Sequence, residues 1–570
     1  MFKFGIFLLA IAAIFGLQWY FEATTTEGQC PGCGVLQRGS NTEPFNCGMC
    51  GLELEVKDGQ FVRYMKSGQA PQTPFEQMRD FAKQAAETKP PPKASPKASS
   101  TGSKKSSSAE VVDVEECKRA FFGEEEDMAA SGEESTGASR ICILGAGPAG
   151  LGLALGIARR GFSGGVVVYD QAEDHETAAR YNPDRSYTID ITGHGARALD
   201  YLGVTHRFDE QLIKFRGIRI LPLGKEEPWT GPGWTGSRGD ICRALLRECR
   251  ENYPGKVKFV FGTTAEVQDA YTGTVVLKDG SGVLTKSFDL VVACDGAGST
   301  ARTKIMADVP GFKSEKASLT NFCTMIHFDQ NTEELDPSWL YVLNIDPPAV
   351  AGAINGDGGP RDPKWFCQIG FRCKNEFKDV PDAIKYIKKT APKVLRHVSD
   401  KELAAFAKRE CVHIGRAVVC NTFNAGRLVL LGDAGNPFPP VGQGINAALE
   451  SAMVLDQCLA AADSQGRDFG WAGAKFTETW LPEAHAVSWI AQRVESGNLW
   501  KMGLVVLAVL LRISVLSDAK KDDRKWSSVA EAAKARQALG FRVAHRLVQA
   551  AVLGLTFFAG YKIGKKRLEG

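Results

Sequence analysis

The sequence predicts an α/β protein built around a Rossmann-type domain. Residues 140–495 alternate short apolar strands with helical stretches, which is the pattern of βαβ units around a largely parallel sheet. The apolar strand Arg140–Leu144 runs directly into Gly-Ala-Gly-Pro-Ala-Gly at 145–150, and a helix rich in small residues follows. The next strand ends at Asp170, which stands 25 positions after Gly145. These observations predict the fold class of the central part of the chain.

The glycine turn at 145–150 has the spacing of a dinucleotide-binding motif. Gly145 permits the tight turn, Gly147 lets the main chain approach a pyrophosphate, and Gly150 lets the helix pack against the strand. The helix opens at Pro148-Ala149, so its N-terminus and positive dipole end face the same negative charge. Asp170 follows at the distance where a carboxylate accepts hydrogen bonds from ribose hydroxyls. The sequence therefore predicts a dinucleotide site here.

Two distant segments repeat the arrangement of a buried strand followed by a polar turn. One strand ends at Asp295-Gly296, with Arg302 shortly after it. The other ends at Gly432-Asp433 and continues through a Pro/Gly loop into a helix that opens near Gly444. Because parallel strands end at the same edge of a sheet, we expect all three turns to meet at one crevice.

In this order, the three turns resemble those of the FAD-dependent aromatic hydroxylases, the group A flavoprotein monooxygenases. The segments Arg185–Thr192 and Ser237-Arg238 are most similar to the kynurenine 3-monooxygenase branch, and the resemblance covers residues 139–565. An apolar C-terminal tail is shared with the membrane-bound members. The third turn departs from the family pattern, because Asn436 stands where the family usually has His and the loop before Gly442 is one residue shorter.

The resemblance implies that FAD is the cofactor and that NADPH or NADH reduces it without a second Rossmann module. By motif, the glycine turn would hold the pyrophosphate, Asp170 the adenosine ribose, and Asp433 the ribityl chain or pyrophosphate. Main-chain amides at the third turn would stabilise the reduced, anionic ring. The other residues expected at the cofactor are Arg185, Arg238, Asp295, Arg302, Gly432, Pro440, Gly442, Gln443, Gly444, Ile445 and Asn446, with Pro440 and Asn446 as catalytic candidates.

The activity implied by the resemblance is hydroxylation of a small aromatic substrate by O₂ through a flavin hydroperoxide. Arg216 or Arg219 could bind a substrate carboxylate, because a guanidinium fork matches that anion, although each could equally be a surface arginine on a strand edge. Two alternatives stay open. One is a hydroxylase or epoxidase of a lipophilic quinone precursor or isoprenoid, and the other is a non-catalytic FAD-binding scaffold.

The N-terminal part carries two Cys-x-x-Cys pairs, Cys30 with Cys33 and Cys47 with Cys50, separated by thirteen residues. Four thiolates at this spacing suit tetrahedral coordination of a structural Zn ion, which predicts a zinc-ribbon-like module. Two disulfides are the alternative if this part faces an oxidising compartment. We expect the module to serve structure or recognition of a protein partner, with a small hairpin after the second pair.

Charge and composition limit the remaining possibilities. The chain has 69 Lys and Arg against 66 Asp and Glu, a net charge of +3, which argues against a nucleic-acid partner. A low-complexity stretch before residue 138 has a basic half rich in Pro and Ser and an acidic half, the composition of a tether. The odd total of 15 cysteines, mostly scattered singly, indicates reduced thiols in most of the chain.

Apolar segments near both ends predict membrane association. Residues 4–21 form an apolar stretch of 18 residues, about 27 Å of helix, which suits a retained anchor or a cleaved signal peptide. Residues 503–511 and 547–561 are shorter, with basic residues around them. The second segment could span the bilayer, whereas the first would lie on the membrane surface or in the protein core; the alternative is an amphipathic pair that lies on the membrane. The positive charges favour a cytosolic catalytic domain, on the endoplasmic reticulum or the mitochondrial outer membrane, and a plastid location stays open.

The expected layout follows from these segments. The strands expected in the substrate sheet are 317–328, 340–343 and 365–373. The predicted parts are 1–22 (anchor or signal), 28–66 (zinc-ribbon-like module), 67–138 (linker), 139–312 (first part of the FAD-binding domain, with a substrate-domain insertion near 205–235), 313–425 (substrate-domain sheet), 426–500 (second part of the FAD-binding domain) and 501–570 (membrane-associated helices).

Overall fold

The computed structural model divides into two compact units, Met1–Val62 with Ala138–Gly570 and Arg63–Gly137. The structure describes residues 25–31, 36–41, 43–46, 53–57, 60–64, 140–182, 184, 186–318, 322–371, 374–413, 415–439, 442–494 and 524–536. Several predictions lie outside these residues, namely those on the apolar segments 4–21, 503–511 and 547–561, on the linker 67–138, and on Cys33, Cys47, Cys50, Arg185 and Pro440.

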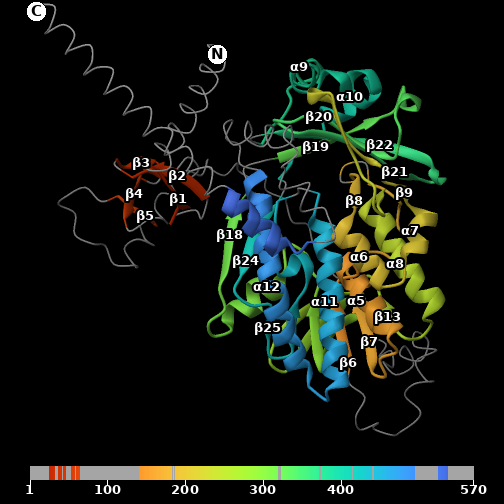
Figure 1. Cartoon of the computed structure of the whole chain (residues 1–570), viewed down its shortest axis with the longest axis vertical. Coiled ribbons are helices and arrows are strands. Elements are labelled where there is room, and N and C mark those ends of the chain that lie inside the picture. The colour runs from red at the N-terminus through yellow and green to blue at the C-terminus, as the bar shows by residue number, and fades with distance from the viewer. Residues whose placement is uncertain are drawn as a thin grey trace, which may run out of the picture. The chain divides into compact units, whose positions relative to one another are not determined.

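A six-stranded sheet forms the centre of the larger unit, in the order β13-β7-β6-β17-β26-β25 (Figure 1). Its first five strands run parallel, and only the edge strand β25 is antiparallel to its neighbour. The three strands that precede the predicted turns, β6, β17 and β26, are therefore adjacent and end at the same edge. The strands are β6 (Arg140–Leu144), β7 (Gly165–Tyr169), β13 (Lys258–Val260), β17 (Leu290–Ala293), β25 (Asn424–Ala425) and β26 (Leu428–Leu430).

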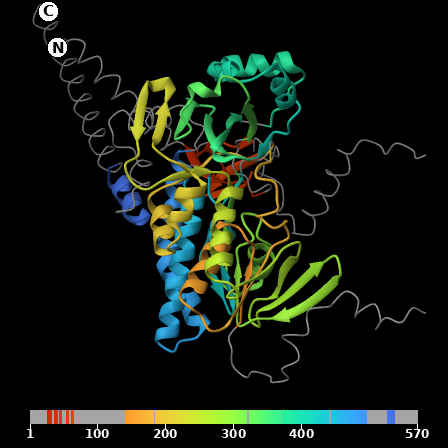
Figure 2. The ribbon, with the colours of Figure 1, turned by 90° about the vertical axis from the view of Figure 1, so that its right-hand side faces the viewer.

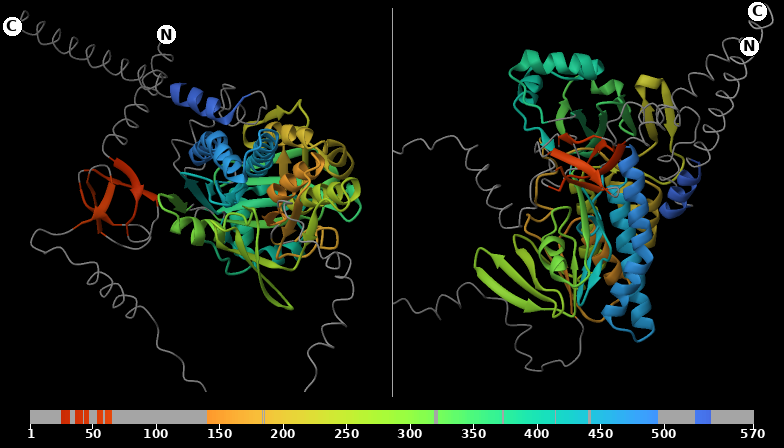
Figure 3. Two further views of the ribbon diagram at one scale, coloured as in Figure 1. Left: turned by 90° about the horizontal axis from the view of Figure 1, so that it is seen from below. Right: turned by 90° about the vertical axis from the view of Figure 1, so that its left-hand side faces the viewer.

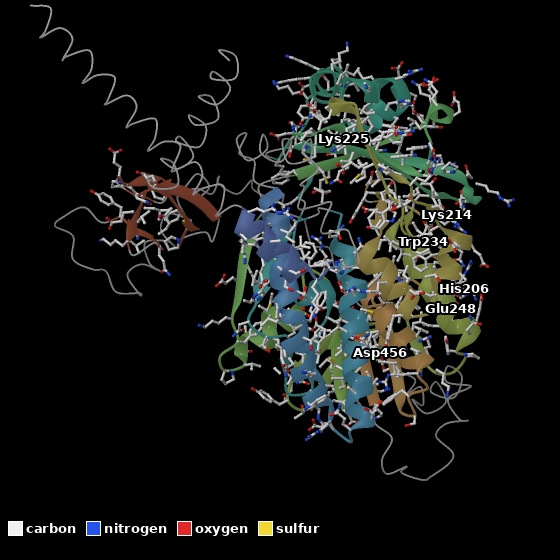
Figure 4. All side chains as sticks on the ribbon, in the orientation of Figure 1. His206, Lys214, Lys225, Trp234, Glu248 and Asp456 are labelled. Carbon is white, nitrogen blue, oxygen red and sulfur yellow. The ribbon has the colours of Figure 1, made fainter. Side chains whose placement is uncertain are left out.

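Helices pack around this sheet and share one large apolar core with it. Asp456 is buried on α11, where it accepts hydrogen bonds from Arg160 Nε (2.9 Å) and Tyr201 Oη (2.9 Å); Figure 4 labels it on this helix. Figure 4 also labels His206 and Glu248, which join α7 to α8. The helices are α5 (Pro148–Arg159), α6 (Gly193–Tyr201), α7 (Thr205–Gln211), α8 (Arg238–Asn252), α11 (Gly444–Ser464) and α12 (Phe469–Val494).

A seven-stranded sheet, in the order β11-β10-β20-β21-β22-β19-β23, carries a second core with α9 and α10 (Figures 1 and 2). Strands lie in all three ranges expected for the substrate sheet, and β21 between them was not predicted. The elements are β10 (Gly217–Ile220), β11 (Lys225–Pro228), β19 (Phe322–Phe328), β20 (Trp339–Asn344), β21 (Ala349–Gly356), β22 (Gly359–Phe371), α9 (Val380–Thr390), α10 (Asp400–Phe406) and β23 (Val412–His413).

Smaller sheets complete the unit, and the antiparallel sheet β14-β15-β16 is drawn in yellow-green in Figure 3. Short helical turns include the π-helical η2 (Ala301–Ile305), η3 (Met306–Asp308) and η6 (Gly432–Ala434). The remaining elements are β8 (Ile189–Ile191), β9 (Ile213–Lys214), η1 (Leu221–Leu223), β12 (Trp234–Gly236), β14 (Thr264–Asp269), β15 (Thr274–Asp279), β16 (Gly282–Ser287), β18 (Ser314–Ser318), η4 (Thr332–Glu334), η5 (Pro392–His397) and β24 (Arg416–Cys420).

The N-terminal part contains two small antiparallel sheets. Strands β1 (Thr25–Gln29) and β2 (Leu36–Ser40) pair, and β3 (Phe45–Asn46), β4 (Glu53–Lys57) and β5 (Gln60–Arg63) form the other sheet. Neighbouring β4 and β5 match the hairpin expected after the second cysteine pair. Cys30 is buried with Leu54 and Phe61. Within the described ranges there is no group of three or more potential metal ligands, and the other three cysteines lie outside those ranges.

No helix in the described part of the chain combines the length and the apolar character needed to cross a membrane. The three segments predicted to associate with a membrane all lie outside this part.

Candidate cofactor site

The glycine turn between β6 and α5 leaves no room for side chains at two of its three glycines. Gly145 has a φ of +109°, and a β-carbon there would lie 2.5 Å from the carbonyl oxygen of Cys294, at the end of β17. A β-carbon on Gly150 would lie 2.0 Å from the carbonyl oxygen of Gly145. These contacts bring α5 and two adjacent strand ends together, as the motif requires.

Asp170 and His175 hold the main chain of this turn from both sides. The Ala146 amide donates to Asp170 Oδ2 (2.6 Å), and the Ala172 amide donates to Asp170 Oδ1 (2.8 Å). His175 Nε2 donates to the Ala146 carbonyl (2.7 Å), and burial lowers the pKa of His175, which favours the neutral ring. His175 could not be predicted from the sequence, because none of the residues around it in the chain links it to the turn.

Arg238 supplies positive charge beside the turn. Its Nη2 lies 3.1 Å from the position that a β-carbon on Gly147 would occupy. Arg238 is the first residue of α8, and Ser237 caps this helix in a capping box with Asp240. The cap fixes the start of α8 and thereby the origin of the arginine side chain. A guanidinium group at this point suits the oxygens of a phosphate.

The third turn contacts the first helical turn of α5. A β-carbon on Gly432 would lie 3.0 Å from the β-carbon of Ala149. The next residue, Asp433, is open to solvent, yet burial raises the pKa of its carboxyl group, while Arg238 and Arg302 oppose the rise. The two observations agree if the carboxylate faces a recessed space that water can enter. All three turns thus meet at one place.

Tyr187 has the same two properties as Asp433. Its side chain is 45% exposed, but burial raises the pKa of its phenol, and the charge of Asp433 raises this pKa further. Arg238 lowers it, and Cys323 on β19 raises it. Charged and polar groups of the motif turns and of the seven-stranded sheet therefore both influence the phenol of Tyr187.

Arg302, which was expected at the cofactor, ties the third turn to the second through main-chain hydrogen bonds. Only 2% of Arg302 is exposed. Its Nη1 donates to the carbonyls of Asp433 (3.2 Å) and Ala434 (2.6 Å), and Nη2 donates to the carbonyl of Ala297. Because main-chain carbonyls occupy these donors, the side chain positions the two turns.

Asp295, in the second turn, has a hydrogen-bond partner for only one of its two carboxylate oxygens within the described residues. Its Oδ2 accepts from the Thr300 amide (2.8 Å), whereas Oδ1 is buried and has no hydrogen-bond partner among the described residues. A buried acceptor without a partner is unfavourable, so a ligand hydroxyl at this point would stabilise the carboxylate.

The start of α11 gives Asn446 a different role from the one expected. We expected it at the cofactor as a catalytic candidate, but its side chain is fully buried, and its hydrogen bonds within the described residues all join it to main-chain groups. It accepts from the Thr192 amide (3.1 Å) and donates to the carbonyls of Asp190 (3.2 Å) and Gly442 (3.2 Å). Asn446 therefore fixes the loop before α11. Among the described residues, no atom lies within 4 Å of the position that a β-carbon on Gly444 would occupy, so there is room beside the first residue of α11.

Gln443, Asn436 and Ile445, which lie between the third turn and the first residues of α11, also contact neighbouring parts of the protein. Gln443 is buried and its Nε2 donates to the Gly442 carbonyl (2.9 Å). Asn436, which departs from the family pattern, donates to the Ala484 carbonyl (3.0 Å) and accepts from Ser488 Oγ (2.9 Å). The amide at 436 thus ties the third turn to α12. Ile445 is packed against the core.

Both arginines considered for a substrate carboxylate are already paired. On β10, Arg219 Nε lies 2.8 Å from Glu226, and its guanidinium carbon lies 4.7 Å from the ring centroid of Trp339. Arg216 is 66% exposed and lies 3.4 Å from Asp336. A substrate carboxylate would have to compete with these partners.

The residues at the three turns fit FAD. The glycine turn, the charge of Arg238, the orphaned oxygen of Asp295 and the open N-terminus of α11 match a pyrophosphate, a polyol chain and a ring that becomes anionic.

The family model that matches this chain agrees with this assignment. The family model described as FAD binding domain matches residues 138–495. Kynurenine 3-monooxygenase of Sus scrofa is 26% identical over 362 residues, covering 61% of this chain and 74% of that protein. The 3-amino-4-hydroxybenzoate 2-monooxygenase PtnB3 of Streptomyces platensis is 25% identical over 374 residues, covering 62% and 87%. A solved structure of 2-methyl-3-hydroxypyridine-5-carboxylic acid oxygenase matches with a TM-score of 0.49 and 18% identity, covering 66% and 93%. The chain belongs to the FAD binding domain family and is an FAD-dependent oxidoreductase.

Proposed function

We propose that the protein is a monooxygenase that uses NADPH or NADH and O₂ to hydroxylate a small aromatic substrate, in the manner of the kynurenine 3-monooxygenases. The observation that carries this proposal is the meeting of three strand-end turns beside Arg238 and the open N-terminus of α11. The names of the relatives, which are monooxygenases of aromatic compounds, support the same reaction class.

Each part of the site has a task in this reaction. The glycine turn and Arg238 hold the pyrophosphate, and Asp170 holds the adenosine ribose. Arg302 holds the second and third turns together, and Asn446 fixes the loop before α11. When bound, FAD supplies the redox chemistry, taking electrons from the nicotinamide and delivering them to O₂. The N-terminus of α11 favours negative charge that develops on the ring.

The substrate would bind between the motif turns and the seven-stranded sheet. The position of Tyr187 supports this placement, since groups from both sides act on its phenol. The β-carbon that Gly352 on β21 lacks would lie 2.7 Å from Thr188 Oγ1, so the segment before β8 also packs directly on this sheet. A substrate enclosed there would be shielded from water, and the exclusion of water prevents side reactions that would consume O₂ without hydroxylating the substrate.

The remaining proposals rest on the sequence. We place the protein on a membrane, through residues 1–22 or 501–570, on the endoplasmic reticulum or the mitochondrial outer membrane. We further propose that Cys30, Cys33, Cys47 and Cys50 bind a structural Zn ion in a module that contacts a protein partner.

A turnover assay tests the reaction. The full chain, purified in detergent and loaded with FAD, is supplied with NADPH or NADH and isotopically labelled O₂. The panel contains L-kynurenine, 3-amino-4-hydroxybenzoate and a prenylated quinone precursor. We expect one labelled oxygen in a hydroxylated aromatic product. Labelled product from the quinone precursor alone would replace the proposal with the lipophilic-substrate alternative. An FAD-loaded chain that oxidises no nicotinamide with any compound would favour a non-catalytic scaffold.

A further inference from the structure

A helical segment far along the chain packs on the flavin-binding domain. Residues 526–536, drawn in the deepest blue in Figure 2, are separated from α12 by residues 495–525. Trp526, Val529 and Ala530 are buried at 1%, 4% and 2% exposure and belong to the large core. Burial this complete shows that the segment is an integral part of the domain.

Two polar contacts fix the segment along α12. Near its start, the Ser527 amide and hydroxyl donate to the two carboxylate oxygens of Glu483, at 2.9 and 2.6 Å. Near its end, Lys534 Nζ lies 5.0 Å from the ring centroid of Trp489. The segment therefore follows α12 in the same direction, and Trp526 lies at the end that reaches α6.

The indole of Trp526 meets His194 on α6. The two ring centroids are 4.6 Å apart at an interplanar angle of 90°, and His194 is 1% exposed. On its other side, His194 Nδ1 lies 2.8 Å from Glu450 Oε2 on α11, and Arg197 pairs with the same carboxylate. Trp526 thus packs against the imidazole that makes a buried polar contact between α6 and α11.

The same pair of helices holds the loop at the flavin site. Glu450 follows Asn446 by one helical turn on α11, and His194 follows Thr192 by two residues at the start of α6. The Thr192 amide donates to Asn446, which also binds the Gly442 carbonyl. A β-carbon on Gly195 would lie 2.2 Å from Asn446 Oδ1, so α6 and α11 approach closely here. A shift of α6 would therefore move the partner of Asn446.

We propose that Trp526 is a positioning residue for the loop before α11, which contains Gly442 and Gln443 and lies at the expected flavin site. Its indole, acting through His194 and Glu450, keeps α6 and α11 at the separation at which Asn446 can hold the main chain at Gly442. This inference rests on FAD binding, which the family supplies, and does not require the proposed hydroxylation. It gives the region beyond α12 a role in the cofactor site, in addition to any role at a membrane.

The test compares three variants of the full chain, Trp526→Ala, Trp526→Phe and Lys534→Ala. The dissociation constant of FAD is measured by flavin fluorescence, well below the unfolding temperature of each variant, together with the visible spectrum of the bound flavin. We expect Trp526→Ala to weaken FAD binding about tenfold and to alter the spectrum, since groups in one network couple. Trp526→Phe should restore most of the affinity. Lys534→Ala, which removes only the contact at the far end, should match the wild type.

A lowered unfolding temperature with unchanged FAD affinity and spectrum in Trp526→Ala would overturn the inference and leave Trp526 a purely structural residue. If Trp526→Ala does not fold, His194→Gln provides the second measurement. Glutamine is polar and close to histidine in size, but it changes the contact with Glu450. Unchanged FAD affinity in His194→Gln would equally overturn the inference. Failure of the proposed hydroxylation would appear in the turnover assay and would leave these affinities as a separate result.

Discussion

Arg302 and Ala434 join two turns that lie 132 residues apart in the chain. One guanidinium nitrogen of Arg302 donates to the Ala434 carbonyl at 2.6 Å and to the neighbouring carbonyl of Asp433. The charge of Arg238 acts on the carboxyl group of Asp433, so the clamp sets the position of a residue expected to bind the cofactor. The second and third motifs are thereby one structural unit.

Replacing Arg302 with Lys should weaken FAD binding without preventing folding. A lysine ammonium cannot reproduce the planar fork that reaches carbonyls of both turns. Loss of one charge-assisted hydrogen bond corresponds to about 1.5–3 kcal/mol, roughly a ten- to hundredfold rise in the dissociation constant. Arg396→Lys, at an exposed arginine that pairs with Glu334 on the substrate side, is the matched control and should bind FAD normally. Equal affinities in both variants would refute the clamp.

Two glycines on α5 should respond in opposite ways to the same substitution. In Gly150→Ala the new methyl group would lie 2.0 Å from a main-chain oxygen, so we expect loss of bound FAD and a large drop in stability. In Gly152→Ala the nearest atoms lie 3.5 Å away, an ordinary contact. Alanine is favoured over glycine in helices by about 1 kcal/mol, so this variant should be as stable as the wild type or more so. Thermal unfolding and FAD content decide, and a harmless Gly150→Ala would contradict the close packing.

Asp433 should make the stability of the FAD-free protein depend on pH. Burial raises the pKa of its carboxyl group in the folded state. The group therefore favours folding while protonated, and this contribution is lost as the pH rises through the raised pKa. Asp433→Asn lacks this dependence, so the variant should be relatively more stable at neutral pH. The advantage should shrink as the pH falls toward the range where Asp433 is protonated. Denaturant unfolding across pH measures this, and a pH-independent difference would contradict the prediction.

The four N-terminal cysteines should bind one metal ion together. Cys47→Ser would remove one of four predicted thiolates, so the zinc content of the purified chain should fall sharply. Cys411→Ser, at a buried cysteine in the substrate-side core, serves as the control. Zinc content that stays the same in both variants would favour the disulfide alternative, which a thiol count under non-reducing conditions would then detect.

The local parts of the cofactor site could be predicted from the sequence, because they depend on short-range patterns. The alternation of apolar strands with helical stretches and the spacing of the glycines predict the strand before Gly145 and the helix after it. The geometry of parallel sheets predicts that the three strand ends meet. The partners of Arg302 and Asn446 could not be predicted, since each lies across a long stretch of chain. Strand β21 escaped detection because its Ala- and Gly-rich sequence, AVAGAING, lacks the bulky alternating residues of a typical strand.

Long-range packing also explains the position of Asn436. The sequence showed a departure from the family pattern, with no indication of a partner. In the fold, α12 passes beside the third turn and presents the Ala484 carbonyl and Ser488, which an amide satisfies with its donor and acceptor. The asparagine at position 436 therefore serves to bind the neighbouring helix α12, although the sequence alone suggested the loss of a cofactor contact.

The most direct measurement is anaerobic mixing of the FAD-loaded chain with NADPH or NADH, with the flavin absorbance followed in time. An aromatic hydroxylase should show flavin reduction that becomes faster when L-kynurenine or another aromatic compound of the panel is present. Tightly bound FAD that neither nicotinamide reduces, with or without any compound of the panel, would contradict the assignment as a monooxygenase.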